Sequence, residues 1–246
     1  MRRLSCLALL AAAACGGAEK KETVKPVDPP VDHKLGDGPP DDGDEPDDIQ
    51  VEGLRGTLDV SEIQPVVEKR WGEIEGCYAA GIGRNRFVGG KLELKFRVNR
   101  DGTVKRVQVA EGDLGAWQVE KCVLDVARAM TFARPKGGEA EFGFPIEFPG
   151  RGAVGILDDA AAETQLAPDL AELDECAEAA GGRPEQVRIT VYVGAGGRVL
   201  AAGFATPAEE PFADEWADCA AEKALAWRLA DPRGKVKKAQ GWYPPP

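Results

Sequence analysis

Hydrophobic and polar residues alternate over residues 91–98, a pattern that predicts a β-strand with one buried face. Asp101 and Gly102 supply a turn that sends the chain back into a second strand, which continues through Val107 and Val109. The same two-residue period returns over 142–148. The apolar positions of the first and last of these strands are Leu92, Leu94, Phe96, Val98, Phe142, Phe144, Ile146 and Phe148.

Helical spacing precedes and separates these strands. Ser61 and Gln64 resemble a capping box at the start of the first helical stretch. The second stretch covers 116–131, with apolar residues three or four positions apart. The order α-β-β-α-β predicts an α+β domain over 57–150, in which a three-stranded antiparallel sheet carries helices on one side.

The second part of the chain repeats this order. Cys176 and Cys219 each follow their counterparts, Cys77 and Cys122, by roughly 100 positions, a spacing that indicates a duplicated domain. We therefore expect two tandem domains of the same fold. A linker over 151–163 would join the first to a second, divergent domain over 164–246.

The N-terminus has the features of an export signal. Arg2 and Arg3 precede an apolar run over 4–14, which is too short to span a bilayer, since spanning takes roughly 20 residues. Small residues lead directly into Cys15, and this arrangement resembles a bacterial lipoprotein signal whose cysteine is lipidated. The alternative is a plain secretory signal cleaved near Ala14. Either interpretation sends the chain out of the cytoplasm, with 1–14 as the signal peptide.

Residues 15–56 are acidic, rich in proline and free of aromatic residues. Such a segment buries too little apolar surface to offset its ordering entropy, so we expect a disordered tether. The whole chain has a net charge of −11 and no block of basic residues, which argues against nucleic-acid binding.

The composition also restricts the chemistry. There is one histidine, His33, which lies in the tether, and the only serine beyond the signal is Ser61. A serine nucleophile therefore has no suitable base, and metal chemistry lacks ligands. We expect no enzyme activity, no catalytic residue, no metal and no cofactor.

Four cysteines form two equivalent pairs, one in each predicted domain. The first domain contains Cys77 and Cys122, and the second contains Cys176 and Cys219 at equivalent positions. In an exported chain this arrangement predicts one disulfide per domain. Zinc binding and redox catalysis are the alternatives, but both are disfavoured because the chain has no C-x-x-C motif.

Several short motifs resemble the AgmX/PglI C-terminal domain family, which is related to the TonB C-terminal domain. They recur in order across 57–149: Gly76-Cys77-Tyr78, Gly90-Lys91-Leu92, Arg100-Asp101-Gly102-Thr103-Val104, Lys121-Cys122-Val123 and Thr131-Phe132-Ala133-Arg134-Pro135. The second domain departs from the pattern. It lacks the tyrosine after Cys176 and has Gly196-Gly197 in place of the Asp-Gly turn.

The resemblance implies a non-enzymatic envelope protein that binds partner proteins by lending a sheet edge to an extended peptide. It also implies a link to gliding motility, from which the family takes its name. Gly16 after the lipidated cysteine favours an outer-membrane lipoprotein that faces the periplasm, or a periplasmic protein if the chain is not lipidated. The alternative function is a periplasmic protein that binds peptidoglycan or a small ligand, for which we expect an aromatic pocket between the domains.

The third strand of the first domain is the candidate binding edge. Pro145 cannot donate a ladder hydrogen bond, so it belongs on an edge or at a bulge. Glu141, Gly143, Pro145 and Glu147 would face away from the helices. Binding of an extended peptide from an envelope protein is one interpretation. Protection of the edge against aggregation is the other.

Overall fold

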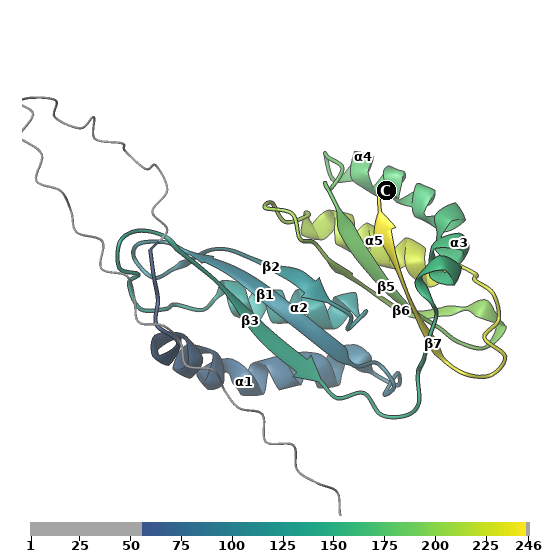
Figure 1. The fold of residues 1–246 in the computed structure, drawn as a ribbon, viewed down its shortest axis with the longest axis horizontal. Helices are drawn as coiled ribbons and strands as arrows, with labels where there is room; N and C mark the ends of the chain where they lie inside the picture. Colours follow the sequence, from purple (N-terminus) through teal and green to yellow (C-terminus); the bar gives the residue numbers. More distant parts are fainter. Residues whose placement is uncertain (1–55, 245–246) are drawn as a thin grey trace, which may run out of the picture. The chain divides into compact units, whose positions relative to one another are not determined.

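A computed structural model places residues 56–244 in two β-sheets, each packed against helices (Figure 1). These residues belong to one compact unit, Gln50–Pro246. We call residues 56–150 the first half and residues 151–244 the second half. The predicted signal peptide, Cys15 and the predicted tether up to residue 55 lie outside the described residues.

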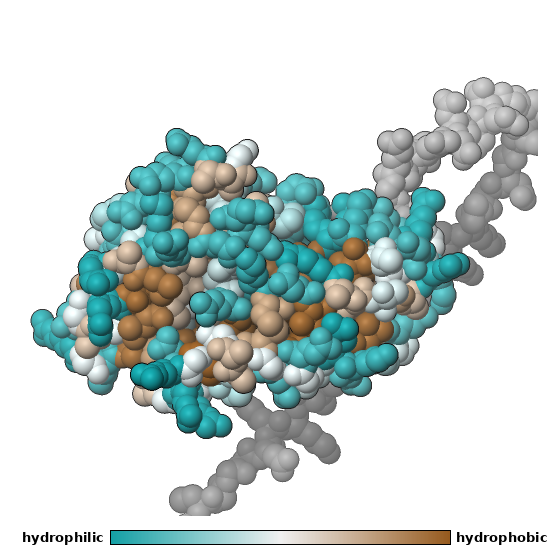
Figure 2. Space-filling model, turned by 180° about the vertical axis from the view of Figure 1, so that it is seen from behind, coloured by the Kyte–Doolittle hydropathy of each residue, from teal (hydrophilic) through white to brown (hydrophobic). Residues whose placement is uncertain are grey.

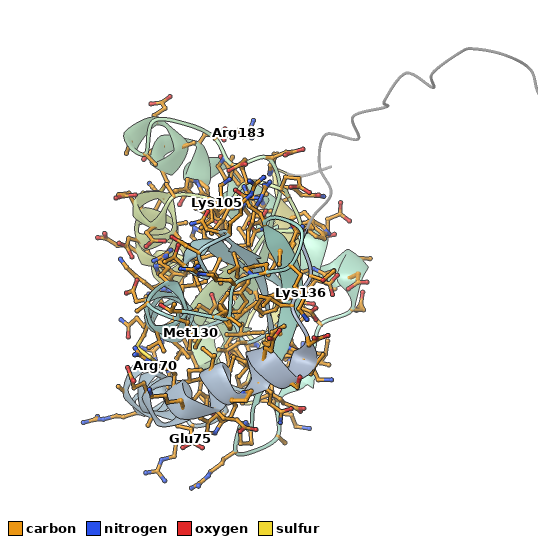
Figure 3. The ribbon with its side chains drawn as sticks, turned by 90° about the vertical axis from the view of Figure 1, so that its left-hand side faces the viewer. Arg70, Glu75, Lys105, Met130, Lys136 and Arg183 are labelled. Carbon is orange, nitrogen blue, oxygen red and sulfur yellow. A yellow bond between two sulfur atoms is a disulfide. The ribbon has the colours of Figure 1, made fainter. Side chains whose placement is uncertain are left out.

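The first half has the predicted order of elements. These are α1 (Val60–Ile82), β1 (Gly90–Val98), β2 (Val104–Gly112), α2 (Trp117–Arg128) and β3 (Ala140–Phe148). The sheet is antiparallel with the order β2-β1-β3. The apolar side of β1 is buried, from Leu92 to Val98, because α1 and α2 cover that face. Lys105 on the sheet and Glu75 on α1 mark opposite sides of this half (Figure 3).

The second half contains the remaining elements. They are β4 (Gly155–Ile156), α3 (Asp159–Leu170), the 3₁₀ turn η1 (Ala171–Leu173), α4 (Asp174–Ala179), β5 (Val187–Val193), the turn η2 (Ala195–Gly197), β6 (Val199–Ala205), α5 (Asp214–Ala226) and β7 (Lys237–Tyr243). Its strand order is β4-β7-β5-β6. Without β4, the order of its three long strands matches that of the first half.

The prediction of a three-stranded antiparallel sheet is correct for the first half and wrong for the second. β4 pairs in parallel with β7 and turns the second sheet into a four-stranded mixed sheet. The backbone of Gly155 donates to Val236, and that of Leu157 donates to Lys238. A strand of two residues is too short to show any alternation, so the sequence pattern gave no sign of it. The segment expected to be a linker thus contains β4 and the start of α3.

Both predicted disulfides are present, and each joins the two helical segments of its own half. Cys77 on α1 is bonded to Cys122 on α2, and Cys176 on α4 is bonded to Cys219 on α5. The Cα atoms are 5.6 Å apart in both bridges. Disulfides persist in oxidising surroundings, so the pair indicates an exported protein.

We expect each disulfide to contribute substantially to stability, because each closes a long loop in the unfolded chain. The sequence separations are 45 and 43 residues. Replacing both cysteines of one pair, as in C77S/C122S, should lower the free energy of unfolding by about 4 kcal/mol. Denaturant unfolding without reductant measures this loss. A loss below about 1 kcal/mol for both pairs would contradict the expected role.

Candidate functional site

The outer edge of β3 is the first feature to consider. β1 occupies one side of β3 along its whole length. On the other side, the bridge from Gly56 to Ala140 is the one backbone pairing found among residues 56–244. Gly143, Pro145 and Glu147 are all exposed. The structure therefore places most of the predicted binding residues along an open strand edge.

Pro145 shows which backbone groups face outward. The register between β1 and β3 runs without a bulge past the pair Glu93–Pro145. Because proline has no N–H to give to β1, its nitrogen faces the outer side of the ladder. Outward groups alternate along a strand, so the backbone groups of Glu141, Gly143 and Glu147 also face the open edge.

The face of the first sheet that points away from its helices carries a network of ion pairs. Lys95 lies 3.1 Å from Glu141, and both Arg97 and Lys105 bind Glu139. The hydrogen bond from Lys105 is the main cause that holds the pKa of Glu139 below its usual value. Glu141 is thus held by Lys95 and is only partly exposed, which distinguishes it from the other three predicted residues.

A second feature, which sequence reasoning missed, is the contact of the first half with the outer edge of β6. The backbone N–H of Thr206 donates to the carbonyl of Val109 at 2.8 Å. The side chain of Asn85 donates to the carbonyl of Leu200 at 2.9 Å. Elements of the first half therefore satisfy backbone groups along the edge of the second sheet.

Glu120 is the central residue of this contact. Its side chain is 1% exposed and accepts hydrogen bonds from two backbone N–H groups, Ala116 at 3.0 Å and Phe204 at 2.7 Å. The first bond lies at the start of α2 and the second reaches β6 across the two halves. Burial raises the pKa of Glu120 to about 7, although the backbone hydrogen bonds act in the opposite direction.

Polar contacts between the two amphipathic helices extend the joint. The indole N–H of Trp117 donates to Asp218 at 2.7 Å. Arg128 forms a bidentate salt bridge with Asp214, with N–O distances of 2.8 and 2.7 Å. Such fork-shaped arginine–carboxylate pairs fix geometry as well as charge, so α2 and α5 are held in a defined arrangement.

The two halves enclose a groove of about 460 Å³, which we call the inter-half groove. Its walls come from the end of α1, the first turn of α2, β6 and α5. The lining residues are Gly81, Ile82, Asn85, Val88, Ala116, Trp117, Gln118, Leu200, Ala201, Ala202, Asp218, Ala221, Glu222 and Leu225. Hydrophobic residues also gather on the rear face of the molecule (Figure 2).

A further hollow of about 560 Å³ lies where β3 ends. Tyr78 forms part of its wall, and its single hydroxyl proton is shared between the carbonyls of Val88 and Pro149, at 2.8 and 2.9 Å. Arg86 and Arg151 also line it. This hollow, the end-of-strand hollow, lies between the end of α1 and the segment that follows β3, and it carries two arginines.

No group of three or more histidine, cysteine or acidic side chains within the described range is arranged to hold a metal ion. None of the helices in that range is both long and apolar enough to cross a bilayer. Comparisons with protein-family models, with curated proteins and with solved structures find no match for this chain.

One signal in the sequence could have identified Glu120. It lies next to Val119 and four positions before Leu124, both of which are buried on α2. A carboxylate inside the apolar stripe of a helix is rarely buried without partners. The partner on β6 lies in the other half, so helical spacing alone does not supply it.

We expect the stability of the protein to fall as pH rises from 5 to 8. The ordinary pKa of a glutamate side chain is 4.5, and burial raises that of Glu120 to about 7 in the folded protein. Its stabilising contribution is therefore complete below pH 4.5 and is lost as the pH rises through 7. The free energy of unfolding should decrease by up to about 3 kcal/mol across this range.

Chemical denaturation of the protein and of Glu120→Gln at several pH values tests this expectation. The amide side chain does not titrate, so the variant should be destabilised at every pH but should show a flatter pH dependence. Glu222→Gln, an exposed change on α5, serves as the control and should keep the native slope. Parallel slopes for Glu120→Gln and the native protein would refute the assignment.

Proposed function

We propose that this chain is a non-enzymatic adaptor of the cell envelope that binds extended peptide segments of partner proteins by strand addition to β3. The observation that carries the proposal is the open edge of β3, where the only backbone bridge within residues 56–244 is at Ala140. An extended peptide supplies the backbone donors and acceptors that such an edge lacks.

The surroundings of β3 support binding of a peptide in this place. Gly143 has no side chain to block a neighbouring strand, and Glu147 supplies a charge for selecting partners. The end-of-strand hollow adds Arg86 and Arg151 beyond the last residue of β3. A partner strand with an acidic residue at that end would complement these two guanidinium groups.

The alternative interpretation of these residues is that they protect the edge of β3 against aggregation. Pro145 and the glutamates reduce indiscriminate pairing between edges. They do not remove the outward backbone groups of Gly143. A specific partner strand therefore has bonds to gain, whereas a random apolar strand meets the negative charge of Glu147.

The motifs of the first half that resemble the AgmX/PglI family support this role, because the related TonB domains bind peptides at a sheet edge. On the same basis we propose a link to gliding motility. The N-terminal pattern supports lipidation at Cys15 and attachment to the outer membrane, with the two halves in the periplasm. The acidic tether would then separate the binding edge from the membrane.

Site-specific photo-crosslinking in the native cells tests the edge. A photoreactive residue at Gly143 or at Glu147 should capture the same envelope protein, because both positions face the open edge. The matched control is Glu111, an exposed residue of β2 on the other edge of the same sheet. It should capture little or none of this partner.

Gly143→Pro sharpens the test because it removes one outward N–H and leaves the ladder to β1 intact. Capture from position 147 should fall at least about tenfold in this variant, as expected for loss of an edge hydrogen bond and the packing it aligns. Equal capture in the presence and absence of the proline would rule out strand addition at β3.

The proposed lipid anchor has its own measurement. Mass spectrometry of the mature protein should find Cys15 as the first residue with attached acyl chains, and Cys15→Ser should abolish the modification. An unmodified N-terminus on the purified membrane-fraction protein would instead favour plain secretion.

A further inference from the structure

Several of the outward backbone groups of β6 form hydrogen bonds with the first half, but those of one residue, Ala202, do not. The backbone N–H groups of Phe204 and Thr206 both point away from β5, since they donate to Glu120 and to Val109. Outward groups lie on every second residue of an antiparallel strand. The backbone N–H and C=O of Ala202 therefore face the same outer side.

Ala202 lies in the wall of the inter-half groove, between the two points where the first half holds β6. On one side Asn85 donates a hydrogen bond to the carbonyl of Leu200, and on the other Glu120 accepts one from the N–H of Phe204. No residue in the described part of the chain supplies a hydrogen bond to Ala202 from across the groove. Ala202 is only 4% exposed, so its donor and acceptor are sheltered from bulk water.

A sheltered backbone donor and acceptor on one residue form a specific recognition feature. Buried polar groups in proteins nearly always have partners, and an unpaired one is costly. The backbone of one residue in an extended peptide offers an acceptor and a donor with matching spacing. The groove is too closely bounded by α2 and Asn85 for a long added strand, so a short segment fits best.

The other residues that line the groove determine which side chains such a segment should carry. Ile82, Val88 and Leu200 provide an apolar wall, and Leu225 stands at the rim with 44% of its surface exposed. The ionisable lining residues, Asp218 and Glu222, are both acidic. Asp218 already binds Lys121 and Trp117, which leaves Glu222 as the exposed carboxylate that faces an incoming cation.

We propose that the inter-half groove binds a short extended peptide segment with an apolar side chain next to a lysine or arginine. One residue of the segment exchanges backbone hydrogen bonds with Ala202. Its apolar neighbour packs on Ile82 and Leu225, and its cationic side chain pairs with Glu222. This site is separate from β3 and does not depend on strand addition there.

The aromatic residue of the groove favours a peptide over a sugar ligand. Sugar binding relies on an accessible aromatic face, but Trp117 is only 4% exposed. Its indole N–H is already bonded to Asp218, and its ring packs edge-on against Phe204 and Phe212. Trp117 therefore serves the joint between the halves and offers no open platform to a cell-wall glycan.

Selection from a random heptapeptide library displayed on phage, against the whole mature protein, provides the probe. Enriched peptides should combine apolar residues with lysine or arginine and lack acidic residues. A synthetic copy of the most enriched peptide, added to isotope-labelled protein, should shift the NMR amide signal of Ala202 and leave those of Gly143 and Glu147 unchanged.

Two variants test the two recognition features separately. Glu222→Lys reverses the charge at an exposed helix position and should weaken the peptide at least about tenfold. Glu215→Lys makes the same change on α5 outside the groove and should alter the affinity less than about twofold. Ala202→Pro removes the outward N–H from a position where the ladder to β5 does not use it, and should also weaken binding at least about tenfold.

The outcomes separate this proposal from the one for β3. Enriched peptides that shift Gly143 and Glu147 but not Ala202 would overturn the groove site and leave strand addition standing. Absence of any enriched peptide, or a response of Ala202 to purified muropeptides alone, would also overturn it. Equal effects of Glu222→Lys and Glu215→Lys on the affinity for the peptide would refute the charge recognition. This comparison holds even if the Ala202→Pro variant does not fold.

Discussion

The edge of β6 imposes the constraint on which the packing of the two halves depends. An edge strand has unpaired backbone groups, and they must find partners when they are buried. Here the partners come from the other half of the chain: the carboxylate of Glu120, the carbonyl of Val109 and the amide of Asn85. Because these groups lie on α2, β2 and the segment after α1, the second sheet completes its edge only when the first half is folded beside it.

This arrangement makes the two similar halves unequal. In the second sheet β4 covers the first residues of β7, α3 packs against the same strand, and the first half covers β6. In the first sheet β2 approaches β6 at Val109, whereas β3 keeps its outer edge open past Ala140. Two halves with the same order of long strands thus form a unit with one long accessible edge and one short gap, at Ala202, and the proposed functions concern these two places.

The features that the sequence predicted correctly are those set by local pattern. Alternation over 91–98 and helical spacing around Cys77 and Cys122 suffice for the first half and its disulfide, because each half closes its own bridge. β4 is too short for a pattern. Lys237 and Lys238 concealed the start of β7, because charged side chains are not expected where a strand pairs with neighbours on both sides, as these two residues do with β4 and β5. The ammonium group of Lys238 reaches Asp113 and the carbonyl of Gly89. The partners of Glu120 and Ala202 depend on how two halves pack, which no periodicity within one half encodes. The candidate edge at Pro145 was predictable. A pocket between the domains was expected only for the alternative function, and the residues that line the groove were not predictable.

Hydrogen exchange of the β6 amides in the native protein tests the account most directly. If the first half satisfies this edge as described, the amides of Phe204 and Thr206 will exchange as slowly as that of Val191 in the neighbouring central strand. The amide of Ala202 will exchange faster than either, because it borders the inter-half groove and has no hydrogen-bond partner to break. Glu120→Gln should speed exchange at Phe204 in particular. Rapid exchange of Phe204 and Thr206 together with Ala202, in a protein whose central strand remains protected, would contradict the claim that one half completes the sheet of the other.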